Sequence, residues 1–135
     1  MSRTYSKNAL DEIAQSNFDI QPGNYIYAKV SSVDANASHF LVSRDADEIT
    51  VVTTEDQLES LQLIERNKDV YRLISLNVAV PFYSVGFIAT VCDAIASAGM
   101  NVLVVSTFSK DYIMVRADLI ERTEAILLSL GFEER

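Results

Sequence analysis

Hydrophobic residues between positions 71 and 131 change their spacing several times, and each change marks a new structural element. Tyr71–Val80 is an apolar run of strand length that stops at Pro81. A short loop, Phe82–Gly86, then leads into a helical stretch that ends at Gly99. The apolar residues of this stretch recur with the spacing of one helix face, at Ile88, Val91, Cys92 and Ile95.

The pattern continues with two strands and a second helix. Asn101–Thr107 is apolar at almost every position, which is typical of a strand buried on both faces. After a tight turn, Asp111–Arg116 is predicted as the next strand, and the last helix is predicted to begin with Asp118 as its N-cap and to end at Gly131. The order strand, helix, strand, strand, helix predicts an α+β, ferredoxin-like sandwich with its helices on one face of an antiparallel sheet.

One edge of this predicted sheet lacks a partner. A ferredoxin-like sheet normally ends with a fourth strand beside the first, but only Phe132–Arg135 follow the last helix. An apolar edge beside Tyr71–Val80 would favour aggregation if it stayed open. We therefore expect a strand from the first half of the chain, or from a second copy, to cover it. The two halves, residues 1–68 and 69–135, are expected to interlock.

The first half shows weaker signals. Asn8–Ser16 is predicted as a short helix, and Tyr25–Val30 as a strand after a turn. His39–Arg44 and Ile49–Thr53 are predicted to form a hairpin. Thr54 begins a capping-box pattern, so we expect a helix from there whose apolar residues are Leu58, Leu61, Leu63 and Ile64.

Composition and charge narrow the classes of function. The 135 residues are 49% hydrophobic and 22% charged, as in a packed globular protein. A net charge of −8 argues against nucleic acid and against an anionic membrane surface as partners. The chain has neither an N-terminal signal peptide pattern nor an apolar run near the roughly 20 residues that cross a bilayer. We expect a cytoplasmic protein.

The residues that most often carry catalysis are isolated in the sequence. Cys92 falls in phase with the apolar helix face, so it is expected to be a small buried residue and not a nucleophile. His39 is the single histidine and has no evident nucleophilic partner. Asp45, Asp47 and Glu48 lack the spacing of a calcium loop. No catalytic residue, metal site or cofactor is predicted, and a small enzyme built on His39 is the weakest hypothesis.

The loop before the first helix of the second half is the best candidate for binding. The first N–H groups of a helix lack intrahelical partners and suit a carboxylate, with Ser84 as the expected N-cap. Gly86 has no Cβ, so it allows either close approach of a ligand or only tight packing. Asp111 could accept from a ligand amine or simply shape the turn, and Ser106 and Thr107 offer hydroxyl groups nearby.

Several of these stretches resemble the ACT domain family. Val85–Gly86, Ala98–Asn101 and Val104–Val115 carry the resemblance, and Ser106–Val115 follows the pattern Ser-Thr-aromatic-x-x-Asp-aromatic-aliphatic-x-Val. The form is that of small bacterial tandem ACT-like proteins, which are related to aspartokinase regulatory domains and cytosolic arginine sensors. Stretches of the first half, Gly23–Tyr27 and Arg44–Val52, resemble the partner ACT-like half of those bacterial proteins.

The resemblance implies a βαββαβ fold, side-by-side pairing of ACT units and binding of an amino acid at the seam between them. The expected function is that of a regulatory, non-enzymatic protein that acts as a homodimer and binds a free amino acid or a similar small carboxylate. A ligand-free interaction module, and an unidentified protein partner, stay open as alternatives. The expected ligand-binding residues are Phe82, Ser84, Val85, Gly86, Asn101, Val102, Ser106, Thr107 and Asp111.

Overall fold

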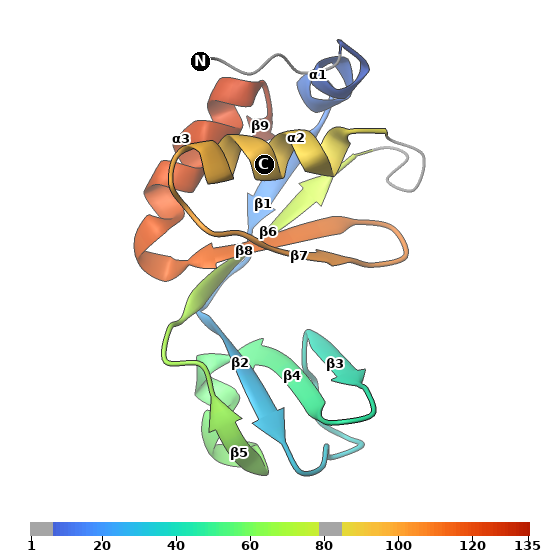
Figure 1. Ribbon diagram of the computed structural model, residues 1–135, viewed down its shortest axis with the longest axis vertical. Helices are drawn as coiled ribbons and strands as arrows, with labels where there is room; N and C mark the ends of the chain where they lie inside the picture. Colours follow the sequence, from blue (N-terminus) through green and yellow to red (C-terminus); the bar gives the residue numbers. More distant parts are fainter. Residues whose placement is uncertain (1–6, 79–84) are drawn as a thin grey trace.

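Strands from both halves of the chain join one sheet in the computed structural model, which describes residues 7–78 and 85–135 (Figure 1). In the second half, β6 (Tyr71–Asn77) pairs antiparallel with β8 (Asp111–Arg116), and β8 pairs antiparallel with β7 (Leu103–Ser106). Helices α2 (Phe87–Ser97) and α3 (Ile120–Leu130) lie on the same face of these strands. The predicted ferredoxin-like α+β fold is confirmed.

The edge of the sheet beside β6 is covered by the first half of the same chain. Strand β1 (Asn17–Ile20) pairs antiparallel with β6, from Asn17 opposite Asn77 to Ile20 opposite Ile74. Strand β9 (Glu133–Glu134) then pairs parallel with β1. The expectation that a strand from elsewhere covers this edge is confirmed, and the halves interlock as expected. The division of the chain at residue 68 stays a prediction.

The first half builds a second group of strands around β2 (Tyr25–Val30). One edge of β2 pairs with β4 (Ile49–Thr54) and the other with β5 (Leu63–Arg66), while β3 (Leu41–Arg44) pairs with β4. The predicted strand Tyr25–Val30 and the predicted hairpin are confirmed. The short N-terminal helix is also present as α1 (Lys7–Ala14).

The helix predicted from Thr54 is wrong. The chain forms only a 3₁₀ helix, Glu55–Ser60, and then the strand β5. Thr54 caps no helix, because its hydroxyl donates to the Asp56 carboxylate. Pairing with β2 satisfies the backbone of β5 and leaves the side chain of Ile64 58% exposed, so helical spacing of leucines was misleading here.

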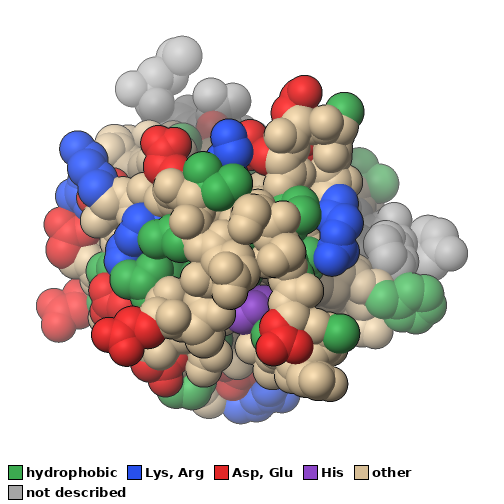
Figure 2. All heavy atoms as spheres, turned by 90° about the horizontal axis from the view of Figure 1, so that it is seen from below, with side chains coloured by type: hydrophobic (Ala, Val, Ile, Leu, Met, Phe, Trp, Pro, Cys, Tyr) green, Lys and Arg blue, Asp and Glu red, His purple; other side chains and the backbone are tan. Residues whose placement is uncertain are grey.

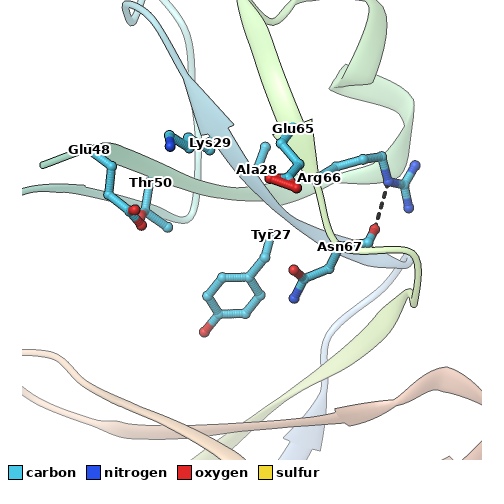
Figure 3. Close-up of a pocket in the computed structure, with 8 residues that line it drawn as sticks. All are labelled: Tyr27, Ala28, Lys29, Glu48, Thr50, Glu65, Arg66 and Asn67. Carbon is cyan, nitrogen blue, oxygen red and sulfur yellow. Dashed lines mark hydrogen bonds between the residues drawn. The ribbon is translucent and has the colours of Figure 1, made fainter.

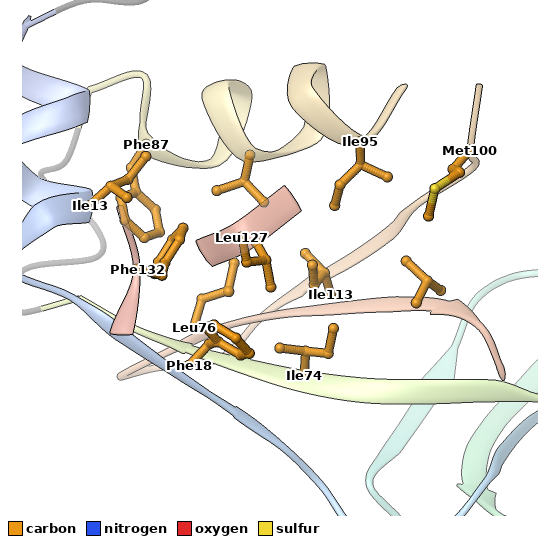
Figure 4. Packing of buried hydrophobic residues seen from close by; sticks show 12 residues of the cluster. Ile13, Phe18, Ile74, Leu76, Phe87, Ile95, Met100, Ile113, Leu127 and Phe132 are labelled. Atoms are coloured by element: carbon orange, nitrogen blue, oxygen red, sulfur yellow. The ribbon is translucent and has the colours of Figure 1, made fainter. Parts of the chain in front are cut away.

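The main hydrophobic core lies between the three helices and the sheet (Figure 4). Phe132 packs edge-on against Phe18 and Phe87, with ring centroids 6.1 and 5.7 Å apart. Further fully buried members come from α1, α2, α3, β6 and β8: Ile13, Ile95, Leu127, Ile74, Leu76 and Ile113. This core fixes both ends of α2 above the sheet.

The opposite face of the β6–β8–β7 sheet contacts the first half. Tyr112 of β8 packs against Phe40, with centroids 4.9 Å apart, and Tyr71 packs against Tyr27 at 5.9 Å. Aromatic pairs of this kind contribute beyond the area that they bury. The second group of strands is therefore held against the sheet by aromatic side chains.

Three expectations for the second half need correction. Asn101–Thr107 was expected to be buried on both faces, but β7 is an edge strand that pairs only with β8 within the described residues, and Val104 is 42% exposed. Gly86 occupies the N-cap position of α2 in place of Ser84, which lies outside the described residues. Asp118 does not cap a helix, because it lies in a 3₁₀ turn and pairs with Arg116 at 2.8 Å.

Candidate functional site

Asp111 is held in place at the turn between β7 and β8. The residue is only 7% exposed, and one carboxylate oxygen accepts a hydrogen bond from Ser106 Oγ at 2.7 Å. The turn itself is closed by the Thr107 N–H, which donates to the Lys110 carbonyl at 2.8 Å. Ser106 is the hydrogen-bond donor to this carboxylate within the described residues, and a carboxylate has acceptor sites for further donors.

Cys92 on α2 lies close to this carboxylate. Cys92 is half-buried, so the expectation of a small buried residue is only partly met. Burial, and secondly the charge of Asp111, raise the pKa of the Cys92 thiol. A raised pKa keeps the thiol protonated, which is opposite to what a nucleophilic cysteine requires.

Gly86 and Val85 lie at the start of α2. Gly86 has φ of +84°, a left-handed conformation that favours glycine, and its carbonyl accepts the Thr90 N–H at 2.9 Å. Val85 is 83% exposed. The N–H groups of the first turn of α2 lack intrahelical acceptors, as at any helix start.

The β6–β8 register brings these two groups of residues to the same end of the sheet. Leu76, near the exit of β6, lies opposite Asp111. The β7–β8 turn and the beginning of α2 therefore lie at one end, on the right in Figure 1. Five predicted site residues share this end: Val85, Gly86, Ser106, Thr107 and Asp111. Phe82 and Ser84 lie outside the described residues.

Asn101 and Val102 lie at the other end of α2. Gly99 ends the helix with φ of +79°, and Asn101 follows it as an exposed residue, while Val102 packs against the main core. An 11-residue helix is about 16 Å long. A single chain therefore does not bring all the predicted site residues together.

A pocket of about 410 Å³ opens beside Asn101. Its walls come from the residues after α2, the starts of β6 and β7, the end of β8, the turn before α3 and the first turn of α3. The charged residues around it are Asp69, Arg116 and Arg122. Sequence reasoning missed this pocket, because these residues belong to separate segments and match no motif.

A second, more open hollow of about 290 Å³ lies in the first half (Figure 3). Lys29 and Arg66 share it with Glu48 and Glu65, so its charges balance. Arg66 extends away from Tyr27 and donates from Nε to the Asn67 carbonyl at 2.9 Å. We assign no ligand to this hollow.

The remaining candidates for chemistry are placed apart from both ends of α2. His39 Nδ1 lies 2.9 Å from Thr53 Oγ1 in the first half. Within residues 7–78 and 85–135, no cluster of three or more acidic, histidine or cysteine side chains could hold a metal ion.

No helix in the described part of the chain is long and apolar enough to span a membrane. On the face seen in Figure 2, acidic and basic side chains are interspersed.

A family model matches most of the second half of the chain, and solved structures share the fold over most of its length. A model of the ACT domain family matches residues 67–129. A Vibrio cholerae protein of unknown function is 18% identical, with a TM-score of 0.76 and coverage of 91% of this chain and 94% of that one. An Agrobacterium tumefaciens protein is 22% identical, with a TM-score of 0.74 and coverage of 89% and 92%.

A third similar structure is that of a regulatory subunit of an enzyme. The regulatory subunit of aspartate kinase from Thermus thermophilus, in its ligand-free form, is 10% identical and has a TM-score of 0.62. The match covers 86% of this chain and 96% of that subunit. Likeness at such identities shows a shared fold. No curated protein sequence matches the chain.

Proposed function

The chain carries an ACT domain at residues 67–129, and from this premise we propose that the protein is a regulatory, non-enzymatic protein that binds an amino acid or similar small carboxylate. The ligand lies at the seam between two copies of the chain. Binding at a seam favours the arrangement of the two copies that forms the complete site, which is how a ligand produces a regulatory signal.

The unpaired edge of β7 carries this proposal. Within the described residues, β7 pairs only with β8, so one row of its backbone groups is free for another strand. Two copies related by a two-fold axis pair such edges antiparallel, which sets Leu103 of one copy near Ser106 of the other. Asn101 of one copy then approaches Gly86 and Asp111 of the other.

Pairing of this kind reunites the site residues that one chain keeps apart. The ligand carboxylate accepts from the free N–H groups at the start of α2, beside Gly86. The ligand amine donates to Asp111, a residue that is 7% exposed and whose carboxylate already accepts from Ser106. Asn101 from the other copy closes the site with its amide group.

The fold of the solved relatives supports a regulatory role. A regulatory subunit of aspartate kinase shares the arrangement of strands and helices over 86% of this chain. In this proposal the first half, residues 1–68, is an ACT-like unit that packs against the second half, residues 69–135. The thiol of Cys92, with its raised pKa, gives no support to catalysis.

A ligand-free interaction module is the alternative. It requires the site to be filled by side chains of the protein itself. Phe108, an aromatic residue of the turn between β7 and β8, is 87% exposed. The alternative predicts the same dimer without any ligand.

Thermal unfolding with a panel of the common amino acids, combined with sedimentation equilibrium, tests the proposal. We expect a dimer and an increase of the unfolding temperature with one amino acid or a small group of them, because a ligand that binds only the folded state stabilises it. A dimer without any thermal shift would support the interaction module. A monomer without any shift would contradict both.

A further inference from the structure

The pocket beside Asn101 has an apolar floor. Met100 and Met114 line it and are 5% and 1% exposed, and Leu103 is half-buried beside them. Methionine side chains are flexible and polarisable, so they adapt to apolar groups of different shape. The pocket, of about 410 Å³, has a mostly polar lining in which these side chains are the contacts available to a small apolar group.

Arg122 presents a positive charge at the rim. Its guanidinium donates to the Ala98 carbonyl at 2.9 Å, which anchors the side chain at the end of α2. Within the described residues, no carboxylate forms an ion pair with it. A guanidinium has five N–H donors, so Arg122 keeps donors for a ligand carboxylate.

Arg116 adds a second guanidinium to the rim. Its Nε and one terminal nitrogen donate to Asp118 at 2.8 and 2.9 Å. These bonds orient the guanidinium of Arg116, and its other terminal nitrogen can donate to another acceptor. Two oriented guanidinium groups at one rim favour a carboxylate.

Asp69 supplies the opposite charge at the same rim. Asp118 first, and then the nearby charge of Asp69, raise the pKa of the Arg116 guanidinium, so Asp69 lies within electrostatic reach of it. Because Asp118 pairs with Arg116, Arg122 supplies the positive charge that a carboxylate can meet and Asp69 the negative one, which matches a ligand that carries both a carboxylate and an ammonium. A dianion would be repelled by Asp69.

We infer that this pocket binds an α-amino acid with an apolar side chain within a single chain. The carboxylate is held by Arg122 and Arg116, the ammonium by Asp69, and the side chain lies against Met100 and Met114. This site goes beyond the seam site of the proposed function. It lies at the opposite end of α2 from Gly86 of the same chain and needs no second copy, although Asn101, which lines it, is also the residue that the seam site takes from the second copy.

Calorimetric titration of the full chain tests the ligand class. The probes are L-methionine, glycine, L-methioninol, which lacks the carboxylate, and 4-methylthio-2-oxobutanoate, which lacks the amine. We expect L-methionine to bind at least roughly tenfold more tightly than each of the others, because each lacks one of the three contacts. Equal binding of glycine, or no binding of L-methionine, would overturn the inference.

Variants then locate the binding. Arg122→Gln removes the charge from the rim and is expected to weaken L-methionine binding at least roughly tenfold. Arg44→Gln, the same change at an exposed position of β3, is the control and is expected to bind as the wild type does. Circular dichroism and thermal melting establish that both variants are folded. Equal affinity of the two variants would overturn the inference.

A third variant separates this pocket from the seam. Val104→Lys on the open edge of β7 opposes pairing of two copies and does not alter the pocket lining. L-methionine binding that survives in the monomeric variant supports a site within one chain, even if the seam site fails its own test. Binding that is lost together with the dimer would overturn the inference and assign the ligand to the seam.

Discussion

The carboxylate of Asp19 accepts two hydrogen bonds from the guanidinium of Arg135, at 2.9 and 2.6 Å, across 116 positions of the sequence. Asp19 belongs to β1 and Arg135 follows β9, so this ion pair ties the last strand to the first. Asn77 of β6 donates to the same carboxylate at 2.8 Å. The strand that covers the edge of β6 is therefore fixed by side chains as well as by backbone pairing.

This ion pair predicts a pH-dependent contribution to stability. Hydrogen bonds from Arg135 are the largest of the causes that hold the pKa of Asp19 below its ordinary value. Burial of the carboxylate opposes this effect, and the hydrogen bond from Asn77 adds to it. Because the folded state lowers this pKa, the ionised carboxylate stabilises the fold above the unfolded value of about 3.9, and the stabilisation is lost as the pH falls through the lowered pKa.

Arg135→Gln is expected to lower the free energy of unfolding by roughly 0.5–1 kcal/mol near neutral pH, since the arginine is 63% exposed. Urea denaturation measures this difference, which we expect to shrink as the pH is lowered from about 5 to about 2.5. Arg44→Gln is the control and should leave the stability unchanged. A difference that stays constant over this range would contradict an origin in Asp19.

Two neighbouring leucines on α3 differ in burial, so replacing each in turn distinguishes the contribution of core packing to stability from that of helix formation. Leu127 is fully buried, whereas Leu128 is 47% exposed. Leu127→Ala is expected to destabilise the protein by about 2–5 kcal/mol, because it leaves a cavity among the core side chains. Leu128→Ala should change stability by less than about 1 kcal/mol. Chemical denaturation of both variants is the measurement, and equal effects would contradict the described packing of α3.

Elements in which apolar residues alternate or run without a break could be predicted from the sequence. Strands that form only by pairing with a neighbouring strand could not. Strands β2 and β8 have the predicted ends, because apolar residues alternate or run without a break between turn residues. β1 was missed since its four residues, Asn17–Ile20, include two polar ones and form a strand only against β6. β5 was missed because Leu63 and Ile64 continued a helical spacing.

The candidate site could be predicted only in its parts. Gly86 and Asp111 were found from a loop and a turn, and the β6–β8 register brings them to one end of the sheet. Asn101 was predicted as a site residue from the family resemblance. Its separation from Gly86 by the length of α2 became visible only in the structure. The charged rim of Arg116 and Arg122 leaves no local signal, because its residues meet only after the sheet has formed.

Two of the strand edges that lack a partner within the described residues, those of β7 and β5, allow a controlled test of pairing. Val104 on β7 is 42% exposed, and Ile64 on β5 is 58% exposed. Val104→Lys places like charges close together in a two-fold β7 pair, so we expect the dissociation constant of the dimer to rise at least roughly tenfold, about 1.4 kcal/mol. Ile64→Lys should leave it unchanged. Sedimentation equilibrium of both variants decides which edge pairs, and a loss of the dimer with Ile64→Lys alone would assign pairing to β5.

Asp111 should discriminate ligands by their amine. Asp111→Asn keeps the shape of the side chain and its contact with Ser106 but removes the charge that meets an ammonium. We expect a loss of affinity of roughly tenfold or more for whichever amino acid stabilises the wild type, and little change for a carboxylate without an amine. Asp11→Asn on α1, an exposed position, is the matched control. An equal loss for both kinds of ligand would show that Asp111 acts on the fold and not on the amine.

The same substitution should make Cys92 more reactive. Burial first, and then the charge of Asp111, raise the pKa of the Cys92 thiol, so the thiolate that reacts with an aromatic disulfide reagent is scarce near neutral pH. Asp111→Asn removes the second cause and leaves the first, so the pKa should fall and the reaction should become faster at a fixed pH. The pH dependence of the rate distinguishes a lowered pKa from a loosened structure. A lowered pKa moves the midpoint of the profile, whereas loosening raises the rate at every pH. If the midpoint is the same in both proteins, the carboxylate of Asp111 does not act on the thiol.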